Sequence, residues 1–222
     1  MDQNVILVET VPLEFDLESL GCRLRIRPGQ TKFMDRLSRL AEEAVRVARP
    51  KAVARLCGLT ILDEENVQVG EVTFSSPLLR QKMDGLGRAF PYLAREGTEL
   101  ADWSLSLSSS LEQVFASALR EVAVQQAENL LERTLLERYG IAQVSAMNPG
   151  SLKVWSLEEQ VPLFELLAPL PEKLGVTLLP SLMMRPEYSV SGVFFQTDSK
   201  FYNCQLCPKK ECPNRRTPSL VT

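Results

Sequence analysis

The sequence contains no histidine among its 222 residues. Imidazole is the general base of Ser-His-Asp and Cys-His catalysis and a common metal ligand, so both catalytic arrangements and any imidazole-based metal site are excluded. Metal chemistry in this chain would therefore have to use thiolates and carboxylates.

Long apolar runs and a surplus of positive charge are also missing. No run approaches the roughly 18 to 20 apolar residues that a membrane-spanning helix needs, and the N-terminal residues lack the basic start of a secretory signal. The formal net charge is −3, which argues against a broad nucleic-acid-binding surface. We therefore expect a cytoplasmic protein that binds neither membranes nor nucleic acid, and the composition leaves open whether it forms a homo-oligomer.

The composition does support one folded domain, because 45% of the residues are apolar and 24% are charged. Amphipathic periodicity predicts helices over 31–48, 78–90, 110–139 and 160–167. Alternating or short apolar runs predict strands over 5–8, 51–62, 67–74, 103–107, 141–146, 174–179 and 189–195. The predicted fold class is α/β (α+β), a twisted and mainly antiparallel sheet with packed helices, followed by a Cys-rich C-terminal extension.

The five cysteines are unevenly distributed along the chain. Three of them lie within nine residues in the spacing Cys204-x2-Cys207-x4-Cys212, and two of these are followed by proline, which favours irregular loops. An odd number with such clustering is not typical of a disulfide framework. Closely spaced thiolates on a loop are typical of zinc and iron–sulfur sites, so we predict that these three cysteines are metal ligands.

Three interpretations of this cluster remain open from the sequence. A metal centre would need a fourth ligand, and the candidates are Cys22, Cys57, Glu211 and a residue of a partner chain. A redox dithiol could instead form between Cys204 and Cys207, although this pair does not open a helix after a strand as it does in thioredoxin-like proteins. The third interpretation is loop thiols without a ligand. Outside a metal site, Cys22 and Cys57 are expected to be plain buried thiols.

A second group of residues lies between 141 and 203. It begins with the turn sequence Asn148-Pro149-Gly150-Ser151, continues with Ser189-Val190-Ser191-Gly192 before an apolar segment, and ends with Asp198-Ser199-Lys200-Phe201-Tyr202. In order and spacing this stretch resembles the activation domain of vitamin B12-dependent methionine synthase. Residues 31–140 fit the stand-alone relatives of that domain more loosely.

The resemblance implies a function in corrinoid chemistry. Domains of that family bind S-adenosylmethionine and dock over an inactive cob(II)alamin cofactor, so that reduction and methylation restore methylcobalamin. The cobalamin would be carried by a partner, a corrinoid-dependent methyltransferase or corrinoid protein, and the nucleophile would be cobalt rather than a side chain. The implied cofactor-binding residues are Asn148, Pro149, Gly150, Ser151, Phe201 and Tyr202.

The resemblance also implies the domain boundaries and the kind of metal. Residues 1–203 would be the activation-like domain and residues 204–222 a cysteine-cluster tail. Because a corrinoid reactivation system needs low-potential electrons, the family context favours an iron–sulfur cluster over zinc.

The adenosylmethionine loop departs from the family pattern, Arg-x-x-Pro-Gly-Tyr. Ala146 and Ser151 replace its arginine and tyrosine, and Phe201 stands where the family has a ligand-contacting tyrosine. A guanidinium that could bind the ligand carboxylate is therefore missing. Two functions are therefore considered. The first is a stand-alone reactivation protein. The second is an interaction module that binds a metal or senses redox state and has lost S-adenosylmethionine binding. A corrinoid-binding subunit is disfavoured, since no histidine can serve as the lower cobalt ligand.

Overall fold

A computed structural model of the chain describes residues 3–209, 212, 215 and 217–220. In these residues the central element is an eight-stranded sheet whose neighbouring strands all pair antiparallel. The path β1-β2-β6-β3-β4-β5 is joined at β6 by β10, which also pairs with β7. The strands are β1 Val5–Val8, β2 Lys51–Arg55, β3 Cys57–Ile61, β4 Asn66–Val69, β5 Val72–Ser75, β6 Arg88–Arg95, β7 Val144–Met147 and β10 Ser189–Gln196. A small separate ribbon pairs β8 Thr177–Leu178 with β9 Met184–Arg185.

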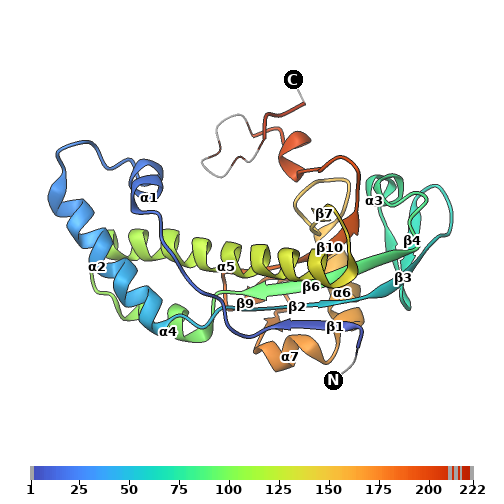
Figure 1. Cartoon of the computed structure of the whole chain (residues 1–222), viewed down its shortest axis with the longest axis horizontal. Coiled ribbons are helices and arrows are strands. Elements are labelled where there is room, and N and C mark those ends of the chain that lie inside the picture. The colour runs from blue at the N-terminus through green and yellow to red at the C-terminus, as the bar shows by residue number, and fades with distance from the viewer. Residues whose placement is uncertain (1–2, 210–211, 213–214, 216, 221–222) are drawn as a thin grey trace.

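Helices cover both faces of the sheet (Figure 1). The helical elements are α1 Leu17–Arg23, α2 Thr31–Val47, α3 Pro77–Lys82, α4 Thr98–Ser106, α5 Ser110–Tyr139, η1 Leu157–Glu159, α6 Gln160–Leu167, α7 Leu170–Leu174 and η2 Asn203–Gln205. The second half of α5 packs on one face, whereas α6 and α7 pack on the other. The arrangement therefore has three layers, as the mixed α/β prediction requires.

Strand β6 lies at the centre of the sheet and is buried on both sides. Phe90 and Tyr92 contact the core beneath α5, while Ala89 and Leu93 contact the core beneath α6. This division follows from the geometry of a strand, in which successive side chains point to opposite faces. A nearly continuous apolar run is therefore what a strand covered by helices on both faces requires.

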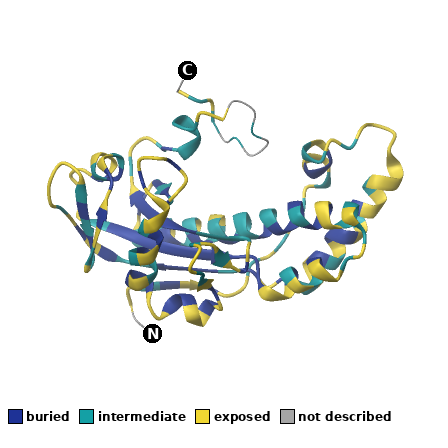
Figure 2. Cartoon of the chain, turned by 180° about the vertical axis from the view of Figure 1, so that it is seen from behind, coloured by how far each residue is buried: buried dark blue, intermediate teal, exposed yellow. Residues whose placement is uncertain are grey.

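The first half of α5 leaves the sheet and forms a helical lobe with α1, α2 and α4 (Figure 2). The core of this lobe includes Leu37, Leu40 and Ala44 of α2 and Phe115 and Leu119 of α5. The three- and four-residue spacing within each helix predicts one apolar face, as observed. Gly140 ends α5 in the left-handed conformation, at φ 61°, and its N–H donates to the carbonyl of Leu136.

Five element predictions need correction. Residues 103–106 belong to the helix α4, because Leu100 and Ser104 face the core while Leu105 is 77% exposed. Residues 67–74 form two paired strands, β4 and β5, rather than one. The helix expected over 78–90 ends at Lys82. Gly85 then adopts a positive φ, and β6 begins at Arg88. Residues 51–62 form two strands, β2 and β3, rather than one. The strand expected over 174–179 is shorter and consists of β8, Thr177–Leu178. The preceding residues belong to α7, which extends to Leu174 and is followed by the left-handed Gly175.

No helix in the described part of the chain combines the length and the apolar content needed to cross a membrane.

Candidate functional site

A cleft of about 260 Å³ lies beside the middle of α5. Four separate stretches of the chain line it: α5, the β7 strand and the turn after it, β10, and the segment that follows β10. The lining residues are Glu128, Glu132, Ala146, Asn148, Ser151, Val190, Phe194, Lys200, Phe201, Tyr202, Asn203 and Cys204. The structure therefore brings the two stretches named by the sequence, 146–151 and 200–204, into one cavity.

The Asn148 side chain makes three hydrogen bonds at this cleft. Its Nδ2 donates to Tyr92 Oη and to the Ser191 carbonyl, both at 2.8 Å, and its Oδ1 accepts from Asn203 Nδ2 at 3.0 Å. Tyr92 Oη in turn donates to Glu128 Oε1 at 2.6 Å. Both Asn148 amide hydrogens are used by the protein, so this side chain mainly positions the turn, and its remaining acceptor capacity on Oδ1 faces the cleft residues.

The turn after β7 is shaped by Gly150. Its φ is +76°, and an added Cβ would lie 2.7 Å from Leu157 Cδ1, so only glycine fits this position. Its N–H donates to the carbonyl of Trp155, whose fully buried ring packs edge-on against Phe74 with 5.7 Å between ring centroids. Pro149, beside it, is buried. Pro149 and Gly150 therefore act here through the shape of the turn that carries Asn148 and Ser151.

Gly192 of β10 allows the backbone of β7 to approach the floor of the cleft. A Cβ at this position would lie 2.4 Å from the Met147 carbonyl oxygen and 2.6 Å from Asn148 Nδ2. Both neighbours are held, one by the sheet and the other by the hydrogen bonds of Asn148. The glycine of the Ser-Val-Ser-Gly sequence is thus required by close packing.

We expect Gly192→Ala to lower the free energy of unfolding by about 1–3 kcal/mol, the usual cost of overpacking a filled interior. Urea unfolding followed by circular dichroism measures this change. Gly58→Ala is the matched control, because Gly58 also lies in a strand and an added Cβ meets nothing within 4 Å. Equal stability of Gly192→Ala and Gly58→Ala would contradict the close approach.

The segment after β10 lines the cleft, and an ion pair and a hydrogen bond hold its successive residues in place. Lys200 pairs with Glu132 of α5. The backbone N–H of Phe201 donates to Ser145 Oγ at 2.7 Å, and the Phe201 ring joins the core on the far side of the cleft wall. Tyr202, half-buried, then leads into η2. Phe201 is therefore both a core residue and part of the lining.

Glu128 and Glu132 were not anticipated as site residues. They lie one turn apart on α5, so their carboxylates occupy the same face of the helix. The i, i+4 spacing is visible in the sequence, but a glutamate pair on a long helix is usually a solvated face, and nothing local marks it as part of a cavity. The structure adds two carboxylates and one ammonium group, that of Lys200, to the predicted residues.

A larger groove of about 830 Å³ runs along α5 towards α1 and adjoins the cleft. Glu128 and Val190 line both cavities, so the two are neighbours. In Figure 1, α1 and the C-terminal tail rise on the same side of α5, and residues from both line the groove. The polar lining contains both acidic and basic side chains, among them an ion pair between Arg23 and Glu121. The result is one concave face with the cleft at its tail end.

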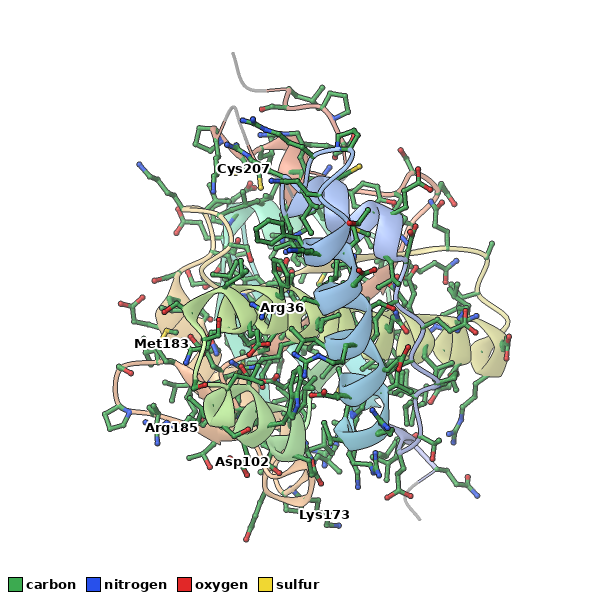
Figure 3. The ribbon with its side chains drawn as sticks, turned by 90° about the vertical axis from the view of Figure 1, so that its left-hand side faces the viewer. Arg36, Asp102, Lys173, Met183, Arg185 and Cys207 are labelled. Atoms are coloured by element: carbon green, nitrogen blue, oxygen red, sulfur yellow. The ribbon has the colours of Figure 1, made fainter. Side chains whose placement is uncertain are left out.

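A further cavity of about 550 Å³ lies between α4 and the β8–β9 ribbon. Asp102 and Arg185 line it, and Met183 at its edge is 55% exposed. Figure 3 shows these residues at the opposite end of the molecule from Cys207 in the tail. This cavity is therefore separate from the concave face.

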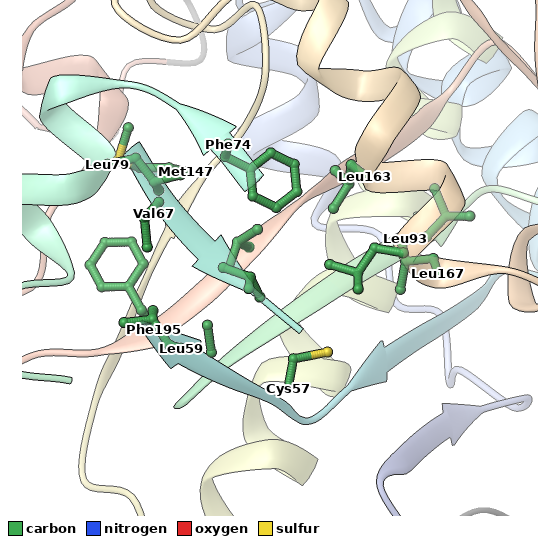
Figure 4. Close-up of a cluster of buried hydrophobic side chains, with 14 of the residues drawn as sticks. Cys57, Leu59, Val67, Phe74, Leu79, Leu93, Met147, Leu163, Leu167 and Phe195 are labelled. Carbon is green, nitrogen blue, oxygen red and sulfur yellow. The ribbon is translucent and has the colours of Figure 1, made fainter. Parts of the chain in front are cut away.

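The five cysteines are all free thiols. Cys57 is buried between the sheet and α6, and burial raises the pKa of its thiol while Arg55 opposes the rise (Figure 4). This agrees with the interpretation of Cys57 as a structural thiol. The expectation that Cys22 is buried is wrong, because it is exposed on α1, where it lines the large groove.

The cysteines of the tail lie in and beside the cleft. Cys204 is part of the lining, and Cys207 and Cys212 are half-buried in the loop that follows. Among residues 3–209, 212, 215 and 217–220, no three side chains of the Cys, Asp or Glu type are gathered as a metal-ion ligand set. Glu211, the candidate fourth ligand, lies outside the described residues. The metal site remains a prediction.

Comparison with known proteins rests on the fold. No family model and no curated protein matches the sequence. Among solved structures, the chain is similar to the crystal structure of the MetH reactivation domain bound to AdoHcy, with a TM-score of 0.61 and 16% sequence identity, over 89% of this chain and 80% of that chain. The chain has the fold of that reactivation domain. The predicted fold class, mixed α/β with a mainly antiparallel sheet, is confirmed.

The reactivation-domain fold was anticipated from residues 141–203, and the similarity extends well beyond them. Because 89% of the chain is covered, the similarity includes most of the residues before 141, which the sequence matched only loosely. The cleft is thus built within a shared fold, from loops whose sequence differs.

Proposed function

We propose that this chain is a stand-alone protein that supports reductive reactivation of a corrinoid-dependent methyltransferase. It binds an S-adenosylmethionine-type ligand in the 260 Å³ cleft and docks the cobalamin-bearing partner on the concave face along α5. The observation that carries the proposal is the position of the cleft. It is lined by residues of the two stretches that resemble the methionine synthase activation domain, and it adjoins the 830 Å³ groove along α5.

The chemistry of the cleft suits a cationic, partly apolar ligand. Glu128 and Glu132 supply negative charge towards a sulfonium or ammonium group, and Val190 and Phe194 supply apolar surface. Asn203 Oδ1 is buried and has no hydrogen-bond partner among the described residues, so it can accept from a ligand donor. Lys200 provides the cation for a ligand carboxylate in place of the guanidinium that Ala146 cannot supply.

The role of the protein is positioning rather than side-chain catalysis. Without histidine, the chain offers no imidazole base, and the reacting centre would belong to the cobalamin of the partner. The residues of this chain hold the methyl donor at a fixed place and exclude water while the partner is docked, which is the usual source of rate enhancement by orientation.

Calorimetry with S-adenosylmethionine on the full chain tests the ligand. We expect binding heat below millimolar ligand, and an about tenfold weaker affinity in Glu132→Gln, equal to about 1.4 kcal/mol, because one carboxylate is lost. Glu137→Gln is the matched control, since Glu137 is exposed on the same helix and does not line the cleft. No heat at millimolar ligand, or equal weakening in both variants, would contradict ligand binding in this cleft.

A second function is supported by the residues at the loop. Ala146 and Ser151 stand where the family has arginine and tyrosine, so a module that docks the partner but binds no adenosylmethionine is the alternative. Binding of a cobalamin-loaded methyltransferase, measured with and without S-adenosylmethionine, separates the two. The alternative predicts the same partner affinity in both conditions, whereas the first function predicts tighter binding with ligand.

A further inference from the structure

In the C-terminal tail, the backbone carbonyls of the three cysteines accept hydrogen bonds from Arg215 and Ser219. The Arg215 guanidinium donates through Nη1 to the Cys204 carbonyl at 2.9 Å, and the Arg215 backbone N–H donates to the Cys212 carbonyl at 3.1 Å. Ser219 Oγ donates to the Cys207 carbonyl at 3.1 Å. The bonds to the Cys204 and Cys207 carbonyls connect the later part of the tail to its start, whereas the bond to the Cys212 carbonyl closes a local turn.

The tail has little apolar packing to keep this shape. Within residues 204–220, as far as the structure describes them, Leu206 packs against the sheet core, and Leu220 is 74% exposed. The helical turn η2 is the regular structure described there. Segments of this size that lack a core are generally held by disulfides or metal ions. The three thiols are free and odd in number, so a disulfide would leave one of them unpaired.

The local backbone favours metal ligation over separate thiols. Cys204 and Cys207 flank a turn in which the Cys207 N–H donates to the Cys204 carbonyl at 3.4 Å, and paired cysteines two residues apart on a turn are typical of thiolate metal sites. Arg215 holds the Cys212 arm next to Cys204 through the same carbonyl. The hydrogen bonds align the two arms, and metal binding draws the three sulfurs together, because ligation and local folding are coupled.

We infer that Cys204, Cys207 and Cys212 bind one thiophilic metal centre, a zinc ion or an iron–sulfur cluster, at the wall of the cleft. Each thiol gives up its proton on ligation. The fourth position is open to a small ligand or a partner residue. Cys204 itself lines the cleft, and the adjacent Asn203 donates to Asn148 Oδ1, so the centre lies next to the hydrogen-bond chain of the site. This inference goes beyond the proposed function and needs neither adenosylmethionine nor a corrinoid.

Metal analysis of the full chain tests the inference. The protein is purified anaerobically, one sample is supplied with Zn²⁺ and another with ferrous iron and sulfide, and unbound metal is removed. We expect one metal centre per chain in the wild type and in Cys22→Ser, and at least a tenfold loss in Cys207→Ser and Cys212→Ser. Cys22→Ser is the matched control because Cys22 is an exposed thiol on α1, and unchanged metal content in this variant also excludes it as the fourth ligand. Acid-labile sulfide and visible absorbance identify a cluster, and their absence with bound zinc identifies a zinc site.

Two further measurements separate loss of metal binding from loss of folding. Far-UV circular dichroism and urea unfolding show that the sheet domain of each variant is intact, and hydrogen exchange of residues 203–209 should slow several-fold when Zn²⁺ is added to the wild type only. Equal metal content in the wild type and in Cys207→Ser, or no bound metal in the wild type in either sample, would overturn the inference. A wild-type chain that takes up no metal in either sample but binds S-adenosylmethionine would overturn the inference while leaving the proposed function intact.

Discussion

Replacing Glu96 by glutamine should lower the free energy of unfolding by about 3–5 kcal/mol, because it breaks a buried ion pair from one side. The Glu96 side chain is fully buried at the end of β6 and accepts from Arg120 of α5 through two bonds, Nε to Oε2 at 2.6 Å and Nη2 to Oε1 at 2.7 Å. Glutamine keeps the shape but not the charge. Among the described residues, the carboxylate left to pair with Arg120 would be that of the exposed Glu187, at 3.8 Å.

The cost of the substitution comes from the arginine side of this pair. Burial raises the pKa of Glu96, and the hydrogen bond and charge of Arg120 oppose that rise. Burial also disfavours the charge of Arg120, but the hydrogen bond and charge of Glu96 outweigh it and raise the pKa of the guanidinium. Arg120 therefore remains charged at neutral pH, and it is left buried without its partner in the variant.

Urea unfolding at pH 7 measures the effect, with Arg39→Gln as control. Arg39 bonds Glu43 and Glu112 but its side chain is 56% exposed, and exposed ion pairs contribute about 0–1 kcal/mol. If Glu96→Gln proved no more destabilising than Arg39→Gln, the pair would not hold the sheet to the helical lobe.

Trp155→Ala should cost about 3–5 kcal/mol of unfolding free energy, as expected for removal of a large buried aromatic side chain. The ring is fully buried against Phe74. The backbone carbonyl of Trp155 accepts from Gly150, so the same residue holds the turn that carries Asn148. Loss of the ring leaves a cavity beneath the cleft, and we expect ligand affinity to fall with stability.

The neighbouring Val154→Ala is the control for Trp155→Ala. Val154 is 47% exposed, and substitutions at such positions usually change stability by less than about 0.5 kcal/mol. Thermal and urea unfolding compare the two variants directly. A small effect at Trp155 would mean that the turn is held by its hydrogen bonds alone, against the packing described.

Much of the fold could be predicted because its signals are periodic. The apolar stripe over 110–139 and the glycine that ends it correctly give α5, and the short apolar runs correctly locate β1 and β10. Residues 103–107 misled because serines alternate with Trp103, Leu105 and Leu107, a pattern that fits a strand, while the contacts that bury Leu100 and Ser104 come from distant helices. Propensity and pattern do not contain that tertiary information.

The site was predictable only where its residues are consecutive. Turn 148–151 and segment 200–204 were both named from the sequence, and the structure places them in one cleft. The contact of Asn148 with Tyr92 joins residues 56 positions apart, and that with Asn203 joins residues 55 apart. No local pattern encodes such pairs. The same holds for Glu128 and Glu132, which become cleft residues only because the chain returns over α5.

The uninterrupted length of α5 has a mechanical consequence. Thirty helical residues span about 45 Å, from the lobe containing α2 to the sheet. Since one rigid rod forms the backbone of both ends, the lobe cannot swing as a body joined by a flexible linker would. A tilt of the lobe would therefore move Glu128 with the helix, and the cleft would change shape with it.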